Sequence, residues 1–155
     1  MLNFYKPLYN PTGLTGLCGS SITTGTFNGI INEIFCHVSA PPSGSSNIFY
    51  QYRKVYIKNN YLTPITTVGI YVDAIEHPEQ IHLGVETGTN QMCASPTGAP
   101  TGVTFSSYTG YQTSLQIGTL AAATYTGIWI RQTLSGITQS DPYATFRLYA
   151  AGVVT

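Results

Sequence analysis

The sequence predicts an all-β protein with one immunoglobulin-like antiparallel β-sandwich. Short runs of alternating apolar and polar residues recur between turn signals about 8 to 12 residues apart, as in sandwich folds. No segment keeps the 3.6-residue period of a helix for long enough to form one. The stretch from Leu115 to Thr133 is the most informative. It reads as a short strand, a turn of small residues and a second strand, which together form one corner of a sandwich.

Composition and charge bound the function. A chain of 155 residues can bury a single core. Only 8% of the residues are charged, against about a quarter in an average protein, and six basic and six acidic residues cancel. We therefore expect no nucleic-acid partner and no membrane partner, because no net field attracts polyanions and no apolar run reaches about 18 residues. So little charge suits a protein covered by neighbours in an assembly.

The N-terminal segment is predicted to lie outside the sandwich. Residues 1–20 are rich in Gly, Pro, Asn and Leu and show no periodicity. We predict an extended N-terminal arm over residues 1–21 and a β-sandwich domain over residues 22–155. Leu14 and Leu17 have no evident partner within such a sandwich, so they are expected to contact a neighbouring subunit.

The remaining chain divides into strands and turns. Asn28-Gly29 is the signature of a two-residue hairpin turn. In residues 49–59, alternation places Val55 and Ile57 toward the core and Tyr52, Lys54 and Tyr56 on the opposite face. The other predicted strands are 65–73, 81–85, 103–105, 114–117, 126–133 and 143–150.

The three cysteines and the serines do not indicate a disulfide framework or a catalytic site. Cys18, Cys36 and Cys93 are an odd number at wide spacing without a CxxC pair, so each is expected to be a buried or half-buried side chain. No serine lies in a G-x-S-x-G motif. The glycines of residues 13–19 lack the flanking strand and helix of a phosphate loop. We predict no catalytic residue and no cofactor, and hence a protein that is not an enzyme.

One ionisable cluster is compatible with a metal site. It comprises Glu76, His77, Glu79, His82 and Glu86. His82 and Glu86 would share a strand face, and imidazole with carboxylate can bind a metal ion. However, Pro78 makes the first half a turn, and the ligands lack a short fixed spacing such as HExxH. We interpret the segment as a solvated turn and strand face, with no metal. Arg53, Lys54 and Lys58 are expected to pair with acidic residues of later strands, or of adjacent copies.

Aromatic residues on predicted outer faces indicate a binding surface. Tyr50, Tyr52, Tyr56, Tyr71 and Trp129 are expected to lie outward. Aromatic rings can stack on sugars, but they are also the usual anchors of protein interfaces and cross-strand pairs. We favour a protein interface, with glycan recognition as the alternative. The candidate interface residues are Leu14, Leu17, Tyr52, Tyr56, Tyr71 and Trp129.

Several fragments together resemble a known family. They are Phe4-Tyr5, Asn10-Pro11, Leu14-Thr15-Gly16 and Ser20-Ser21-Ile22, then Tyr52 to Asn60 and Thr67 to Asp73, then Val103-Thr104-Phe105, LQIGTLAAA, Ile128 to Thr133 and Ala144 to Leu148. In this order they are similar to a group of structural virion proteins of tailed bacteriophages, and they cover most of the chain.

The resemblance implies a non-enzymatic part of the phage particle with an immunoglobulin-like sandwich. The expected function is a capsid cement or decoration protein that bridges capsid subunits and stabilises the head. Its expected partners are the major capsid protein and copies of itself, as a homo-oligomer such as a trimer. It would be made in the host bacterial cytoplasm and lie on the capsid surface of the virion. The alternatives are a tail, neck or head-fibre component, or a host-glycan-binding adhesin.

Overall fold

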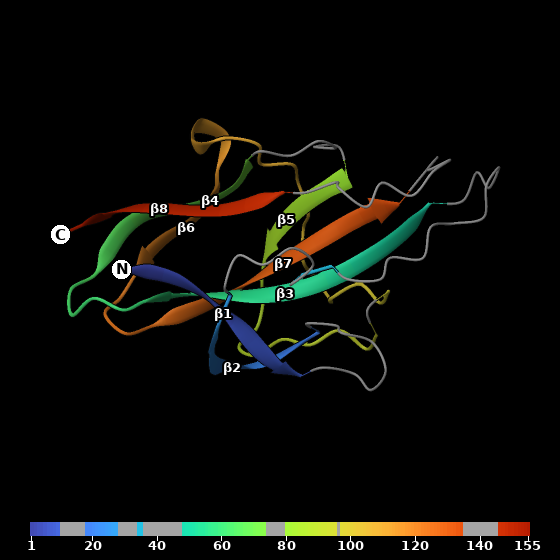
Figure 1. The fold of residues 1–155 in the computed structure, drawn as a ribbon, viewed down its shortest axis with the longest axis horizontal. Helices are drawn as coiled ribbons and strands as arrows, with labels where there is room; N and C mark the ends of the chain where they lie inside the picture. Colours follow the sequence, from blue (N-terminus) through green and yellow to red (C-terminus); the bar gives the residue numbers. More distant parts are fainter. Residues whose placement is uncertain (10–17, 28–33, 36–47, 74–79, 96, 135–145) are drawn as a thin grey trace.

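The all-β prediction is confirmed by the computed structural model, which describes residues 1–9, 18–27, 34–35, 48–73, 80–95, 97–134 and 146–155. Eight strands in these ranges form two antiparallel sheets (Figure 1). The strands are β1 (Leu2–Tyr9), β2 (Gly19–Thr26), β3 (Phe49–Asn59), β4 (Ile65–Asp73), β5 (Ile81–Val85), β6 (Leu115–Leu120), β7 (Tyr125–Leu134) and β8 (Arg147–Val154). A short 3₁₀ turn, η2 (Tyr111–Thr113), precedes β6.

The two sheets differ in size and share a corner. The larger sheet has the order β2-β1-β3-β7-β5, and the smaller has the order β6-β4-β8. Strands β3 and β7 pair without interruption from Phe49 opposite Leu134 to Lys58 opposite Tyr125. The chain crosses from one sheet to the other in the turn between β6 and β7, which is the corner that the sequence predicts. The finer expectation of immunoglobulin-like connectivity stays a prediction.

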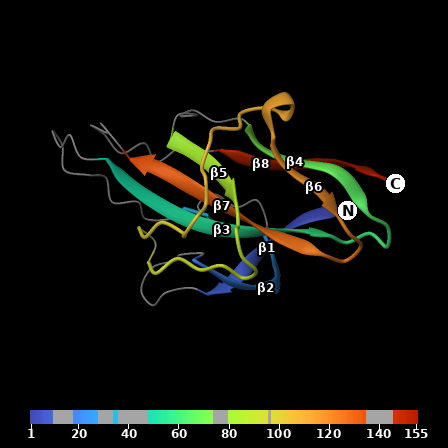
Figure 2. The same ribbon diagram turned by 180° about the vertical axis from the view of Figure 1, so that it is seen from behind.

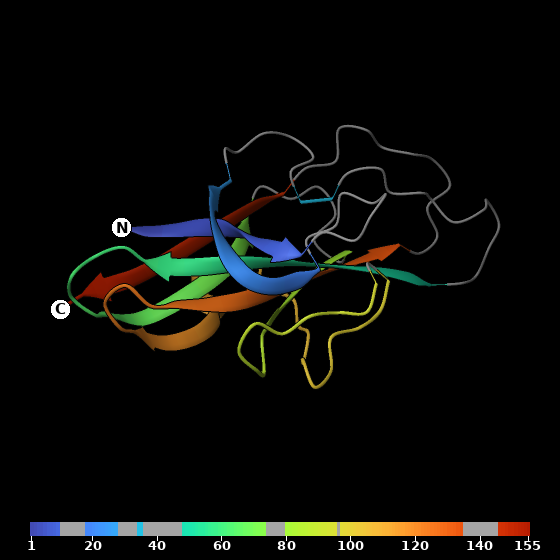
Figure 3. The same cartoon turned by 90° about the horizontal axis from the view of Figure 1, so that it is seen from below.

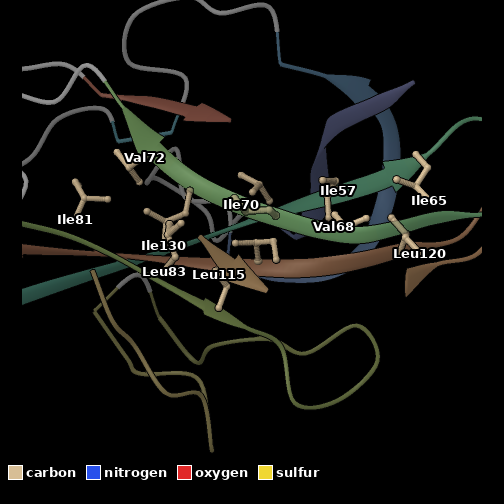
Figure 4. Close-up of a cluster of buried hydrophobic side chains, with 12 residues drawn as sticks. Ile57, Ile65, Val68, Ile70, Val72, Ile81, Leu83, Leu115, Leu120 and Ile130 are labelled. Atoms are coloured by element: carbon tan, nitrogen blue, oxygen red, sulfur yellow. The ribbon is translucent and has the colours of Figure 1, made fainter. Parts of the chain in front are cut away.

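The main core lies between the sheets. In β4, Val68, Ile70 and Val72 are fully buried while Thr67 and Asp73 are exposed, which confirms the period-two alternation. These side chains meet those of β3, β5 and β7 between the sheets (Figure 4). Each such side chain contributes roughly 1.5 to 3 kcal/mol by leaving water. The buried members from the other strands include Val55, Ile57, Leu83, Ile128 and Ile130.

A second layer covers the opposite face of the larger sheet. The segment that follows β5 runs across β3 and β7, as Figure 2 shows from behind. It forms isolated bridges to β2, at Gly19–Met92, and to β5, at Leu83–Ser106. A smaller buried cluster lies beneath it, formed by Cys18, Tyr52, Cys93 and Trp129 with Val103 and Phe105 packed against them. Strand β3 is therefore buried on both faces, whereas the sequence predicts only one.

The predicted N-terminal arm is wrong for the residues that the structure describes. Residues 2–9 form β1, which lies inside the larger sheet and pairs with both β2 and β3. The register with β2 shifts on both sides of Pro7. These irregularities accommodate proline, which has no amide proton to donate to a regular ladder. Leu14, Leu17 and the Asn28-Gly29 turn lie outside the described residues, so their predictions stay predictions.

The predicted strand boundaries agree well in the middle of the chain. Residues 49–59 and 65–73 coincide with β3 and β4. Residues 103–105 were expected to form a strand, but the structure has only the single bridge at Ser106. Cys18 and Cys93 are buried, as predicted. In the described part of the chain, no helix is long and apolar enough to cross a membrane.

Candidate functional site

Exposed apolar side chains gather at one end of the sandwich. Both ends of the chain lie there, beside the β3–β4 loop and the β6–β7 turn (Figures 1 and 3). Leu62, at the tip of the β3–β4 loop, is 95% exposed. The exposed apolar residues of this end, which we call the apolar tip, are Met1, Tyr61, Leu62, Val153 and Val154.

Backbone contacts join the parts of the apolar tip. The Asn60 amide donates to the Met1 carbonyl (3.0 Å), and the Thr155 amide donates to the Pro64 carbonyl (3.4 Å). Val154 lies opposite Ile65 at the end of the β4–β8 ladder. No Asp, Glu, Lys or Arg occurs in residues 60–64, 119–124 or 150–155. These segments thus bring no charged side chain to the tip, and their apolar side chains would lose little by leaving water.

A buried asparagine holds the apolar tip in place. Asn59, the last residue of β3, is fully buried. Its side-chain amide donates to the carbonyls of Thr63 (2.9 Å), Leu120 (3.0 Å) and Ala121 (3.2 Å). Its carbonyl accepts from the Tyr61 amide at 2.8 Å. One side chain thereby fixes the loop that carries Leu62 to the neighbouring β6–β7 turn.

Replacing Asn59 is expected to weaken the fold and loosen the tip. Asn59→Ala leaves buried carbonyls and the Tyr61 amide without partners, so we expect it to lower the free energy of unfolding by about 3 kcal/mol. Urea unfolding measures this change. The exposed neighbour supplies the control, because Asn60→Ala is expected to change stability by less than about 0.5 kcal/mol. Equal effects of the two substitutions would contradict the bracing role.

A tyrosine patch marks a second exposed surface, on the outer face of the smaller sheet. The rings of Tyr71 and Tyr149 stack, with centroids 5.4 Å apart and planes 12° apart. Tyr111 meets Tyr71 edge to face at 6.2 Å. Tyr111 and Tyr149 are exposed and Tyr71 is half-buried. This patch, Tyr71, Tyr111 and Tyr149, is the one place where the described structure presents a predicted interface residue to solvent.

A buried ion pair lies beneath the covering segment. The Lys54 ammonium donates to Glu86 Oε2 (2.5 Å), the Tyr56 hydroxyl (2.9 Å) and the Gln91 carbonyl (3.0 Å). These three acceptors use all three of its protons. Glu86 Oε1 accepts from the Gly127 amide at 2.7 Å. A side chain at Gly127 would collide with both Lys54 and Glu86, so glycine is required there.

The electrostatics of this ion pair indicate a structural role. Burial lowers the pKa of Lys54, opposed by the hydrogen bond and the charge of Glu86. Burial and the Glu86 charge raise the pKa of Tyr56, whose hydroxyl bonds to the Ser20 carbonyl. With every strong donor engaged, the cluster fastens the covering segment to β3 and β7. The pairing of Lys54 with Glu86 confirms, for one of the three predicted cations, pairing with an acidic residue later in the chain.

An open cleft of about 520 Å³ borders this cluster. Its walls are residues 86–89 and residues 123–126, which are mostly threonine, glycine and alanine with Tyr125. Both carboxylate oxygens of Glu86 are already bound to Lys54 and Gly127. The cleft therefore offers neutral hydroxyl and backbone groups to a ligand, and no free charge from Glu86.

The predicted metal-ligand cluster is not assembled by the described residues. Glu86 binds Lys54, and His82 is half-buried in β5 opposite Arg131. Burial and the Arg131 charge lower the pKa of His82. Glu76, His77 and Glu79 lie outside the described residues. Within the ranges that the structure describes, no three His, Cys, Asp or Glu side chains are placed to hold a metal ion.

Three predicted interface residues are wrong as surface residues. Tyr52 is 6% exposed, and Tyr56 and Trp129 are fully buried. The physical reason is the covering segment: Phe105 contacts Tyr52, and Gln91 accepts a hydrogen bond from the Trp129 indole at 3.0 Å. Leu62 is not among the residues predicted from the sequence, although a leucine between Tyr61 and Thr63-Pro64 in a turn has no strand face to bury it.

The geometry defines the class of this protein as an all-β sandwich with a pre-organised apolar tip. Comparisons of the chain with protein-family models, with curated proteins and with solved structures found no match.

Proposed function

We propose that this protein is a structural virion protein of a tailed phage, and specifically a capsid cement protein that docks through its apolar tip. The observation that carries the proposal is the exposed Leu62 with Tyr61, Val153 and Val154, at an end of the sandwich where residues 60–64 and 150–155 carry no charged side chain. Contiguous exposed apolar side chains are typical of interaction sites. The sequence resemblance to tailed-phage virion proteins supports the same assignment.

The tip has the properties that docking to a lattice requires. Asn59 fixes the loop before binding, so less conformational entropy is lost on association. A subunit that binds the assembled shell and not its free subunits stabilises the assembled state by mass action. The proposed partners are the major capsid protein and further copies of this chain, on the capsid surface of the virion, with no catalytic role.

Leu62→Asp is the substitution that tests the proposal. Burial of a leucine contributes roughly 1.5 to 3 kcal/mol, so we expect a loss of about 10-fold to 100-fold in affinity for undecorated capsid shells. Co-sedimentation with shells assembled from the major capsid protein of the same phage measures this affinity. Stability should not fall, because Leu62 is 95% exposed and contributes little to the core.

Leu8→Asp is the matched control. Leu8 is also an exposed leucine, at 66%, but it lies near the opposite end of β1 from the tip. We expect this variant to bind shells like the wild type. Equal losses for both variants, or full binding by Leu62→Asp, would contradict docking through the tip. Electron cryomicroscopy of the particle distinguishes a position on the shell from one in the tail, neck or head fibres.

A host-glycan adhesin is the second candidate function, and the tyrosine patch favours it. Exposed aromatic rings beside polar groups can stack on the apolar faces of sugars. If the protein were an adhesin, Tyr149→Ala would abolish binding to host glycans on an array, whereas Leu62→Asp would leave it intact. If the protein is a capsid cement protein, we expect no glycan binding by the wild type or by either variant.

A further inference from the structure

Two cysteine thiols lie side by side where β2 begins. Gly19 and Met92 form an antiparallel bridge, so Cys18 and Cys93 are the next residues opposite each other. The Cys93 amide donates to the Cys18 carbonyl at 3.0 Å, and Cys93 Sγ lies 3.7 Å from the same oxygen. Both side chains belong to the same small buried cluster.

The backbone at this point is built for close approach. Gly19 has a φ of +110°, and a side chain there would collide with the backbone of Gln91 and Met92. The backbone hydrogen bond from the Cys93 amide to the Cys18 carbonyl holds the two residues opposite each other, and opposite residues of antiparallel strands have Cα atoms about 4.5 to 5.5 Å apart. That separation is within the range of about 4.4 to 6.8 Å that a disulfide accepts. Cys18 and Cys93 can thus be joined with little movement of either backbone.

We propose that Cys18 and Cys93 form a reversible intrachain disulfide by exchange with a small-molecule disulfide such as oxidised glutathione. The Cys18 thiolate attacks the small disulfide, forming a mixed disulfide and releasing one small thiol. Cys93 then loses its proton and attacks the Cys18 sulfur, which releases the second small thiol. Overall, two protein thiols are oxidised to one disulfide, and the small disulfide is reduced to two thiols.

The surroundings favour Cys18 as the attacking group. The hydrogen bond from Cys93 and the charge of Arg53 lower the pKa of Cys18 against the effect of burial. The hydrogen bond to Cys18 and burial raise the pKa of Cys93. Because both thiols are buried, exchange in the native protein proceeds through local opening of the covering segment.

The bond would join the start of β2 to the segment that covers Tyr52 and Trp129. It differs from a structural framework, because the two sheets are held by their core without it. A reducing cell interior keeps both cysteines as free thiols, and oxidising surroundings favour the disulfide. This inference goes beyond the proposed function and does not depend on it.

The test uses the full chain with Cys36→Ser, which leaves only the two proposed partners. The reduced protein is incubated with oxidised glutathione. We expect a mass loss of two hydrogens, a peptide linking Cys18 to Cys93, and a melting temperature higher by roughly 10 °C, reversed by dithiothreitol. A second arm refolds the protein from urea in the same oxidant, so that burial cannot hide the thiols. The control, Cys36→Ser with Cys93→Ser, should show no such rise.

A refolded protein that keeps both thiols free, or that carries only mixed disulfides with glutathione, would overturn the proposal. So would a disulfide that forms without raising the melting temperature, because the bond would then lie outside the native geometry.

Discussion

Deletion of residues 1–9 is expected to abolish cooperative folding. The deletion removes β1 from between β2 and β3, and with it the side chains of Leu2 and Phe4 that pack against the main core. It also exposes the edge of β3 at Tyr56 and Ile57, which are fully buried. The lost pairing and burial are comparable with the whole stability of a domain, about 5 to 15 kcal/mol. Thermal unfolding followed by circular dichroism measures the outcome.

The control for this deletion removes Met1 alone. Met1 is 65% exposed and precedes β1, so we expect a cooperative transition close to that of the full chain. If the chain without residues 1–9 unfolded cooperatively with native β content, the segment would be a dispensable arm after all.

Glu86→Gln is expected to cost about 3 to 5 kcal/mol, because it leaves the Lys54 charge buried without its counter-ion. The side chain of Lys54 is fully buried and that of Glu86 is 9% exposed, so water is a poor substitute for the lost carboxylate. Urea unfolding at neutral pH measures the loss. A change below about 1 kcal/mol would mean that the ion pair is solvated.

Two further measurements separate charge from packing at this ion pair. Lys54→Met combined with Glu86→Gln removes both charges, and we expect it to recover most of the loss, since apolar replacements of buried pairs are often neutral. In Glu86→Gln alone, the pKa of Lys54 in the folded state lies below its unfolded value, so the unfolded chain binds more protons. Stability of this variant should therefore rise as the pH is raised from 7 toward about 10.

The sequence pattern predicts a strand well where apolar and polar residues alternate along its whole length. In β4, alternating burial at Val68, Ile70 and Val72 needs only a core on one side. The pattern fails for β1, because Pro7 argues against a strand inside a sheet and only the register shifts beside it show how it is accommodated. It also fails for β3, where Lys54 and Tyr56 are polar groups buried by a distant segment.

The candidate site was less predictable, because it too depends on contacts between segments that are far apart in the sequence. Burial of Tyr52 and Trp129 depends on residues 86–106. This segment lacks the alternation of apolar and polar residues that is typical of a strand, so its sequence does not predict that it covers a sheet. The apolar tip combines parts of the chain that are far apart in sequence, and only the strand register brings Val154 opposite Ile65. Asn59 looks like an ordinary residue at the end of a strand until its three acceptors are known.

The position of the two ends of this chain has a practical consequence for labelling. Met1 and Thr155 are each hydrogen-bonded to the loop that carries Leu62. A fluorescent protein, an affinity tag or a displayed peptide fused to either end would therefore emerge beside Leu62 and shield it from a partner.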